Sequence, residues 1–238
     1  MTVATVCIPW RPSPSRIPPY ERVRAFWAEH FPDWPVIAAD SDTEIFSLAQ
    51  ARNNAVRQAK TDVVVVCDAD TIPIVENVRA AVADPVGVTW PHSVWRLIPA
   101  DWVDRPYEDF VNAPTVIEYE YGLGSALVCT VKEWWRLGGQ PEEFIGWGFE
   151  DCSFHLVVRT LSTLRRMPGV VYSIDHNDKD GNADSPGWSR YGAHVKRNEL
   201  LARSYQCAAG RPWLMREVLK TRYDTAPEND PLAGRFRS

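Results

Sequence analysis

The stretch Val63-Val64-Val65-Val66-Cys67-Asp68-Ala69-Asp70 decides the fold. Four consecutive valines are typical of a central strand that is covered on both faces of a parallel sheet. Asp68 and Asp70 follow directly, and in open parallel sheets ligands bind just outside the carboxyl ends of the strands. A hard divalent cation takes one or two carboxylates and completes its shell with phosphate oxygens and water. The stretch therefore predicts a metal site, the alternative being two aspartates that cap a turn.

The segments on either side of this strand alternate in type. Residues 2–8 and 36–39 have the composition of strands, and residues 20–30 and 44–60 have helical periodicity. The alternation predicts a doubly wound α/β fold. Further strands are expected near residues 123–131 and 169–174, and helices near 133–137, 150–161, 193–207 and 212–222. We expect one domain over residues 1–222, with a disordered tail at 223–238.

Composition narrows the functional classes. The 238 residues are 45% hydrophobic and 24% charged, with a net charge of −5, as in an ordinary globular protein. No signal peptide and no apolar run of the roughly 20 residues that a membrane span needs is visible, so a cytoplasmic protein is expected. The five cysteines are scattered without a C-x-x-C pair, which indicates reduced structural thiols. Residues 195–238 carry nine Lys/Arg against five Asp/Glu, a mildly basic end.

A second motif is Gly146-Trp147-Gly148-Phe149-Glu150-Asp151. Its glycine turn delivers two acids to a helix N-terminus, where the helix dipole favours their ionised forms. An ionised carboxylate can take a proton from an acceptor hydroxyl, and an exposed indole can stack on a sugar ring. The alternative is a capping cluster with Trp147 in the core.

A third motif is Asp175-His176-Asn177-Asp178. A neutral imidazole beside acids can complete a metal shell, although a lone histidine in a loop is usually only solvated. Residues 178–181 resemble part of a calcium-binding loop. That alignment puts His176 and Gly187 at ligand positions that need carboxylates, so a calcium loop is excluded.

In this order the motifs resemble GT-A glycosyltransferases, in particular the β-1,4-galactosyltransferases and the polypeptide GalNAc-transferases. Ile8-Pro9-Trp10-Arg11 resembles the first-strand segment that lines the nucleotide. Ala51-Arg52-Asn53 resembles the helix before the strand that ends in the family's D-x-D segment, here Asp68-Ala69-Asp70. Residues 121–127 resemble the strand beside the donor sugar. Residues 146–151 resemble "GWGGED", with Phe149 in place of the third glycine. The match runs, with gaps, from about residue 3 to 195.

The resemblance implies a fold and a set of roles. The fold is GT-A, a Rossmann-like, mixed but mostly parallel sheet flanked by helices, with residues 1–90 as the nucleotide-sugar half and 91–222 as the acceptor and catalytic half. Asp151 would be the catalytic base beside Glu150, and Asp70, His176 and Asp68 would hold the metal, with Mn²⁺ favoured over Mg²⁺. The implied nucleotide-sugar contacts are Pro9, Arg11, Asp40, Arg52, Asp68, Gly124 and Trp147. The implied acceptor contacts are Trp147, Glu150 and Asp151.

These roles describe transfer of a hexose from a UDP-sugar to an acceptor hydroxyl. A single base opposite the leaving group implies inversion of the anomeric centre. The acceptor is a glycan, a protein or a hydroxymethylated DNA base; only the basic end of the chain favours DNA. Ser173 stands where the galactosyltransferases carry a methionine ligand, so the metal shell differs. One alternative is a nucleotidyltransferase, which the lack of a lysine in the first loop disfavours. The others are a non-catalytic carbohydrate- or nucleotide-binding protein on the same fold and a globular scaffold.

Overall fold

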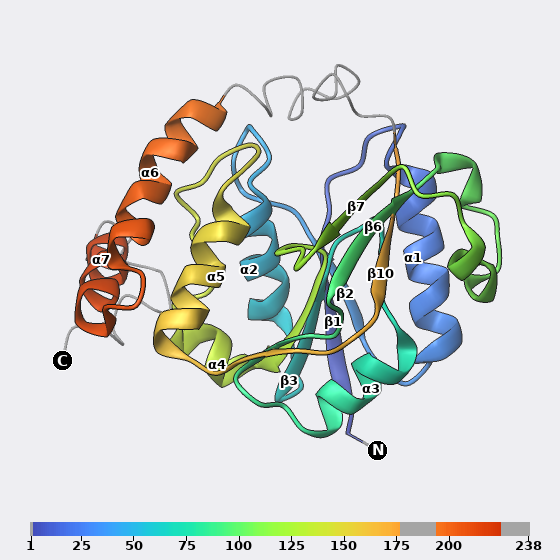
Figure 1. The fold of residues 1–238 in the computed structure, drawn as a ribbon, viewed down its shortest axis with the longest axis horizontal. Coiled ribbons are helices and arrows are strands. Elements are labelled where there is room, and N and C mark those ends of the chain that lie inside the picture. The colour runs from blue at the N-terminus through green and yellow to red at the C-terminus, as the bar shows by residue number, and fades with distance from the viewer. Residues whose placement is uncertain (1, 177–193, 225–238) are drawn as a thin grey trace.

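The computed structural model describes residues 2–176 and 194–224, which contain a central six-stranded sheet of order β2-β1-β3-β8-β5-β9 (Figure 1). Its strands are β1 (Ala4–Pro9), β2 (Val36–Ala39), β3 (Val63–Cys67), β5 (Val88–Trp90), β8 (Ala126–Thr130) and β9 (Leu164–Arg166). β1 pairs in parallel with β2 and β3, and β5 pairs in parallel with β9. β8 runs antiparallel between β3 and β5. The mixed, mostly parallel sheet expected from the sequence is confirmed.

A smaller sheet has the order β4-β10-β6-β7. It consists of β4 (Thr71–Ile72), β6 (Val94–Ile98), β7 (Ile117–Glu120) and β10 (Val170–Ile174). β10 pairs with β6 in parallel and with β4 antiparallel, so Ser173 lies opposite Thr71. Because β4 directly follows the D-x-D segment, this pairing brings the end of β10 beside Asp70. Only β10 of these four strands was expected from the sequence.

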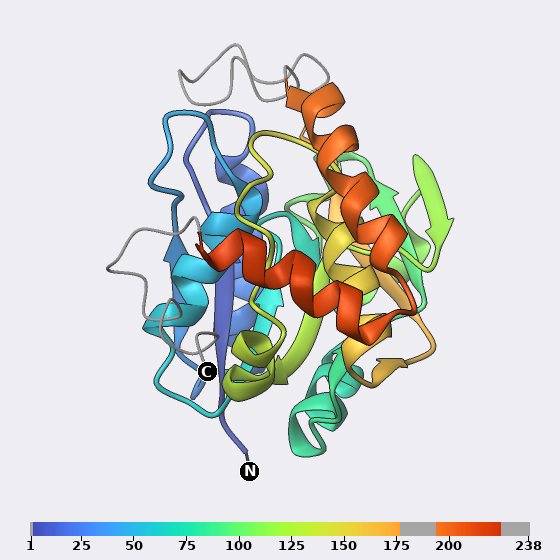
Figure 2. The same cartoon turned by 90° about the vertical axis from the view of Figure 1, so that its left-hand side faces the viewer.

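Helices cover both faces of the central sheet (Figures 1 and 2). One face packs on α1 (Ile17–His30) and α3 (Val75–Ala83), and the short 3-10 helices η1 (Ala100–Trp102) and η2 (Tyr107–Asn112) lie on this side. The other face packs on α2 (Leu48–Gln58), α4 (Val131–Arg136), α5 (Glu150–Leu161), α6 (Val195–Ala208) and α7 (Pro212–Asp224). Within β3, Val63 and Val65 face one core while Val64 and Val66 face the other. The four valines therefore form the doubly covered strand that their composition predicts.

Several boundaries differ from the sequence expectations for local reasons. α2 begins only at Leu48, because Ser47 caps it by accepting from the Gln50 amide, and the residues before it form a loop. β8 begins at Ala126, so residues 121–125 form a connecting segment that we call the strap. α7 continues to Asp224. The expected loop at 177–192 and the rest of the expected tail lie outside the described residues.

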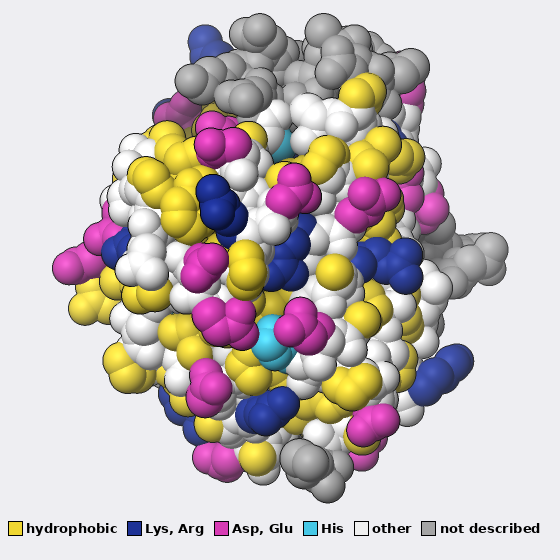
Figure 3. Space-filling model, turned by 90° about the vertical axis from the view of Figure 1, so that its right-hand side faces the viewer, with side chains coloured by type: hydrophobic (Ala, Val, Ile, Leu, Met, Phe, Trp, Pro, Cys, Tyr) yellow, Lys and Arg dark blue, Asp and Glu magenta, His cyan; other side chains and the backbone are white. Residues whose placement is uncertain are grey.

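The surface over α1 shows acidic, basic and apolar side chains interspersed, with no block of one charge (Figure 3). This mixture matches the composition of an ordinary globular domain. Within residues 2–176 and 194–224, no helix has the length and apolar character that a membrane crossing requires.

Candidate active site

Asp68 stands at the carboxyl end of β3 and is fixed through both carboxylate oxygens. Its Oδ1 accepts from Nη2 of Arg52 at 2.6 Å and from Nε of Arg52 at 3.2 Å. Its Oδ2 accepts from the Ser125 amide at 3.1 Å, and the Asp68 amide donates to the Ser125 carbonyl at 2.8 Å. The sheet end and the strap are thereby joined at this aspartate.

Arg52 projects from α2 and is only 2% exposed. Besides Asp68 it contacts Asp151, whose Oδ1 accepts from Nη1 of Arg52 at 2.5 Å. Burial opposes the guanidinium charge, but the carboxylates of Asp151 and Asp68 outweigh burial and raise the pKa of Arg52. One permanently charged side chain therefore bridges the D-x-D segment and the GWGFED motif.

Glu150 lies behind Asp151 and is buried, with 4% of its surface exposed. Burial, reinforced by the negative charge of Asp151, raises the pKa of Glu150 to about 8. The helix dipole favours the ionised form of both acids, but at Glu150 desolvation acts in the opposite direction and raises the pKa. Burial likewise raises the pKa of Asp68 to about 6, against the opposing effect of Arg52. The site is thus a cluster of acids around one arginine.

The turn before α5 is built from left-handed residues. Gly146, Gly148 and Phe149 have φ values of 72°, 101° and 75°. Glycine adopts this region freely, whereas Phe149 is held there at a cost of about 1–2 kcal/mol. The left-handed backbone at this position therefore explains why the resembling sequences carry a glycine where this chain has Phe149. Trp147, at the apex, is 58% exposed, so the alternative that places it in the core is wrong.

Two elements hold this turn in place. The Gly146 amide donates to the Phe46 carbonyl at 3.0 Å, which ties the turn to the segment before α2. From α6, Nδ2 of Asn198 donates to the carbonyls of Ile145 at 2.9 Å and Trp147 at 3.2 Å. Asn198 is fully buried, so α6 supports the turn from behind while the indole of Trp147 stays accessible.

Asp70 and His176 form the second part of the site. Oδ2 of Asp70 lies 3.4 Å from Nε2 of His176, and Oδ1 of Asp70 accepts from the Thr71 hydroxyl at 3.1 Å. Although burial acts in the opposite direction, the contact with His176 lowers the pKa of Asp70. A carboxylate and an imidazole fit two positions in the shell of a divalent transition metal. Within the described residues no group of three His, Cys, Asp or Glu is placed to hold a metal, and Asp68 faces Arg52 instead.

Ser173, which stands where the resembling enzymes carry a methionine, is engaged by neighbouring side chains. Its hydroxyl is 3.0 Å from the Thr71 hydroxyl and accepts from Nε1 of Trp95 at 2.8 Å. These contacts lie within the small sheet, which the side chain of Ser173 helps to hold together beneath Asp70. Asp70 and His176 are therefore the side chains at this place that would hold a metal.

The predicted nucleotide contacts Arg11 and Asp40 lie at the carboxyl ends of β1 and β2, and Pro9 is the last residue of β1. Nε of Arg11 donates to both oxygens of Asp40 at 2.9 Å, while Nη1 donates to the Glu44 carbonyl and Nη2 to the Thr43 carbonyl, each at 2.9 Å. The guanidinium thus stabilises the loop of residues 40–45 beside the site. Direct contact of these residues with a nucleotide stays a prediction.

Gly124 of the strap lies against the acids. A Cβ atom placed on Gly124 would stand 2.7 Å from Oδ2 of Asp151 and 3.7 Å from Oδ2 of Asp68. The strap is held by side chains, since Nε1 of Trp90 donates to the Leu123 carbonyl at 2.9 Å and Nη1 of Arg166 to the Gly122 carbonyl at 3.0 Å. The absence of a side chain at Gly124 leaves the Asp151 carboxylate room at this surface.

Gln140 is the site residue that the sequence analysis missed. Its Oε1 accepts from Nη1 of Arg52 at 2.8 Å, and its Nε2 donates to Oδ1 of Asp151 at 3.2 Å. The neighbouring Asn53 of α2 holds its backbone, donating to the Gln140 carbonyl at 2.9 Å and accepting from the Gln140 amide at 3.0 Å. No sequence pattern marks Gln140; the only hint is its place after two glycines.

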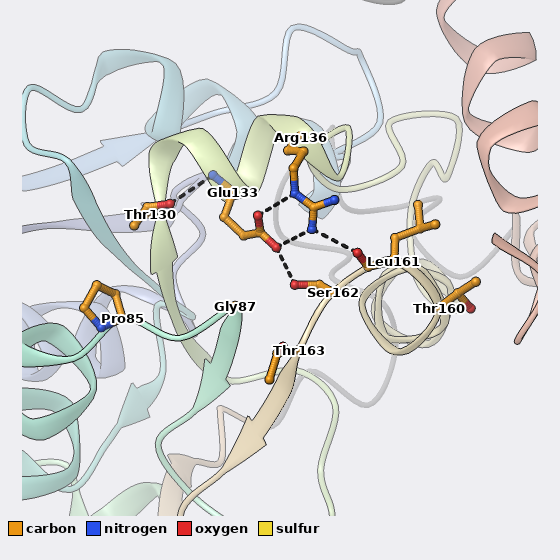
Figure 4. Close-up of a pocket in the computed structure, with 9 residues that line it drawn as sticks. All are labelled: Pro85, Gly87, Thr130, Glu133, Arg136, Thr160, Leu161, Ser162 and Thr163. Atoms are coloured by element: carbon orange, nitrogen blue, oxygen red, sulfur yellow. Dashed lines mark hydrogen bonds and ion pairs between the residues drawn. The ribbon is translucent and has the colours of Figure 1, made fainter. Parts of the chain in front are cut away.

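A separate hollow of about 480 Å³ lies at the opposite end of β8 (Figure 4). Arg136 donates to Glu133 at 2.6 Å and to the Leu161 carbonyl at 3.0 Å, where it stabilises the last turn of α5. Ser162 donates to the same Glu133 carboxylate. These side chains satisfy one another, and β8 separates them from Asp68, so this hollow is no part of the site.

Comparison with known proteins addresses the fold. No protein-family profile and no curated protein sequence matches the chain. Among solved structures, the catalytic domain of Drosophila β-1,4-galactosyltransferase 7 in complex with xylobiose aligns with a TM-score of 0.50 at 17% identity, over 70% of this chain and 65% of that one. The chain therefore has the GT-A fold, as its sequence motifs suggested.

Two further solved structures align over more of this chain. A mutant of the same Drosophila enzyme with manganese, UDP-Gal and xylobiose aligns at 17% identity with a TM-score of 0.49, over 82% of this chain and 74% of that one. GalNAc-T7 with UDP, GalNAc and Mn²⁺ aligns at 15% identity with a TM-score of 0.48, over 93% of this chain and 48% of that one. The chain thus spans less than half of GalNAc-T7.

Proposed function

We propose that the chain is a metal-dependent glycosyltransferase that moves a hexose from a UDP-sugar to an acceptor hydroxyl. The observation that carries the proposal is the bridge of Arg52 between Asp68 and Asp151. It places the end of the D-x-D strand and a partly accessible carboxylate at one edge of a GT-A sheet. A ligand site at this edge is the general expectation for such sheets.

Asp151 is the proposed general base. Its side chain is 23% exposed and stays paired with the charged Arg52, which keeps the carboxylate in position. Removal of the acceptor proton during attack is worth roughly 10²–10⁴-fold in rate. Because one carboxylate acts from the side opposite the leaving group, we propose a single displacement with inversion.

Asp70 and His176 are the proposed metal-holding pair, with Mn²⁺ favoured over Mg²⁺. When bound, a divalent cation would stabilise the negative charge on the departing diphosphate. Pro9 and the loop of residues 40–45, which Arg11 holds, are proposed to lie on one side of the nucleotide, and Gly124 on the other. Asp68, already held by Arg52 and the strap, is proposed to face the ribose rather than the ion.

The exposed indole of Trp147 is the proposed acceptor platform, since an aromatic face stacks well on a sugar ring. This observation favours a glycan acceptor over a protein or a hydroxymethylated DNA base. Glu150, the other proposed acceptor contact, is buried next to Asp151 at the start of α5.

The test is release of nucleoside diphosphate from a panel of UDP-, GDP- and TDP-sugars, with and without Mn²⁺ or Mg²⁺, in the presence and absence of oligosaccharide acceptors. We expect metal-dependent turnover of one donor, lost in Asp70→Ala and strongly reduced in Asp151→Asn. Nucleotide binding without turnover under any condition would favour a non-catalytic binding protein. Pyrophosphate release from nucleoside triphosphates would favour a nucleotidyltransferase.

A further inference from the structure

Two buried side chains, Arg52 and Gln140, form a hydrogen-bonded ring with one oxygen of Asp151. Its Oδ1 accepts from Nη1 of Arg52 at 2.5 Å and from Nε2 of Gln140 at 3.2 Å. The same Gln140 accepts from Nη1 of Arg52 through Oε1 at 2.8 Å. Gln140 is 1% exposed and Arg52 is 2% exposed, so both donors to Oδ1 are shielded from water. The geometry of Oδ1 is therefore fixed by two donors that are themselves joined.

The orientation of the Gln140 amide is determined by its neighbours. Oε1 faces a guanidinium that can only donate, and Nε2 faces a carboxylate that accepts when ionised. Rotating the amide by 180° would place its NH₂ group against the guanidinium of Arg52 and its oxygen against the carboxylate of Asp151. The main chain of Gln140 is also held, because Asn53 pairs with both its amide and its carbonyl. Consecutive residues of α2 thus hold the side chain and the backbone of Gln140.

The other oxygen of Asp151 has a different environment. Within residues 2–176 and 194–224, the hydrogen bonds to this carboxylate all go to Oδ1. Oδ2 faces Gly124, whose missing Cβ would stand 2.7 Å away. The two oxygens are therefore unequal: one is anchored, and the other lies against a surface without a side chain.

We propose that Gln140 is a positioning residue that, with Arg52, anchors Oδ1 of Asp151 so that Oδ2 is the atom that receives the acceptor proton. The inference rests on the proposed glycosyltransferase function. As the acceptor oxygen bonds to the anomeric carbon, its proton passes to Oδ2. The bond from that carbon to the diphosphate breaks, and its electron pair leaves on the phosphate oxygen.

The charged groups around Asp151 define what a change at Gln140 does. Arg52 from α2, Asp68 from the end of β3, and Glu150 and Cys152 from α5 are the titratable neighbours. Glu150 is neutral near pH 7 because burial raises its pKa to about 8. An added carboxylate at position 140 would face Oδ1 of Asp151 directly, in place of the present donor.

The experiment compares Gln140→Glu, which is nearly isosteric and replaces the donor by a charge, with Gln140→Met, which removes both hydrogen bonds and keeps the volume. The matched control is Gln58→Glu, the same change on the exposed end of α2, away from Asp151. Donor turnover is measured against pH, with kcat and the donor KM separated. Melting temperature and circular dichroism confirm folding.

We expect Gln140→Met to lower kcat by roughly tenfold to a hundredfold with little change in the donor KM, since misplacing a base costs rate rather than binding. Gln140→Glu should also move the acid limb of the kcat/KM profile to higher pH, by about one unit or more. Gln58→Glu should match the parent protein. A folded Gln140→Met with parental kcat, or a Gln140→Glu profile that superimposes on the parent, would overturn the proposal.

A second readout separates this inference from the proposed function. If the parent protein turns over no donor, the glycosyltransferase proposal fails. The anchoring of Asp151 is then judged by its carboxyl ¹³C titration. That titration should shift to higher pH in Gln140→Glu and stay unchanged in Gln58→Glu; an unshifted titration would rule out the anchor on its own.

Discussion

Arg52 shows how much of the site depends on a single residue. A buried charge is tolerated only when partners satisfy it, and Arg52 has Asp68, Asp151 and Gln140 at hydrogen-bond distance. These partners come from three separate segments of the chain. The spacing of the motifs in the sequence predicts that such residues converge, but the identity of the residue that joins them follows only from the packing.

Gly124 and Gly122 offer a matched pair of substitutions within the strap. A Cβ at Gly124 would approach Oδ2 of Asp151 at 2.7 Å, whereas one at Gly122 would approach Cβ of Trp95 at 2.6 Å. We expect Gly124→Ala to lower kcat by about 10²-fold with little loss of stability, because it displaces the base. Gly122→Ala should lower the free energy of unfolding by about 1–3 kcal/mol. The measurements are steady-state kinetics and urea unfolding of both variants. A stable and fully active Gly124→Ala would contradict the placement of Asp151.

Glu150 predicts a pH-dependent stability. Its pKa of about 8 in the fold lies above its ordinary value of 4.5, so between these values the folded state binds more protons than the unfolded state. The stability that Glu150 contributes is complete below about pH 4.5 and is lost as the pH rises through about 8. Glu150→Gln keeps the neutral shape and should flatten this decline between pH 5 and 9, with a higher melting temperature at pH 9.

The control for this variant is Glu29→Gln on α1, where the side chain is 63% exposed. It should keep the parental decline in melting temperature. A Glu150→Gln protein whose melting temperature still falls with pH as the parent's does would show that Glu150 is ionised in the fold.

At the level of elements, α6 supports the Trp147 turn through Asn198. Loss of this side chain leaves the carbonyls of Ile145 and Trp147 without their buried donor, which typically costs about 1–3 kcal/mol. We expect Asn198→Ala to raise amide hydrogen exchange in residues 145–149 and to raise the acceptor KM more than the donor KM. Leu200→Ala, on the exposed side of the same helix, is the control. Unchanged exchange in Asn198→Ala would mean that other contacts fix the turn.

The elements that the sequence predicted are those with strong local patterns. β2 and α5 have the expected boundaries, because an apolar run between Pro35 and Asp40 and a glycine turn are both local signals. The antiparallel direction of β8 and the pairing of β4 with β10 depend on contacts between distant segments. The strap was not predicted for a similar reason. Residues 123–125 have the composition of a strand, but Trp90 and Arg166 bind the carbonyls of residues 123 and 122 and keep this segment out of the sheet.

Across the whole molecule, the fold brings three sequence motifs to one edge of the central sheet. The D-x-D segment, the GWGFED turn and the histidine after β10 were each ambiguous alone. The structure brings the first two together through Arg52 and the first and third through the 3.4 Å approach of His176 to Asp70. The sequence could not predict the raised pKa of Glu150 or the ion pair between Asp68 and Arg52, because both result from packing.

The central claim is that this edge binds a nucleotide through a divalent cation held by Asp70. The most direct measurement is calorimetric titration of UDP into the protein with Mn²⁺ and with a chelator, repeated for Asp70→Ala and for Asp62→Ala. Asp62 is exposed near the opposite end of β3, so its variant carries the same change of charge away from the site. We predict Mn²⁺-dependent binding by the parent and by Asp62→Ala, and its loss in Asp70→Ala. Equal binding by all three proteins, or no binding by the parent with Mn²⁺ present, would contradict the account.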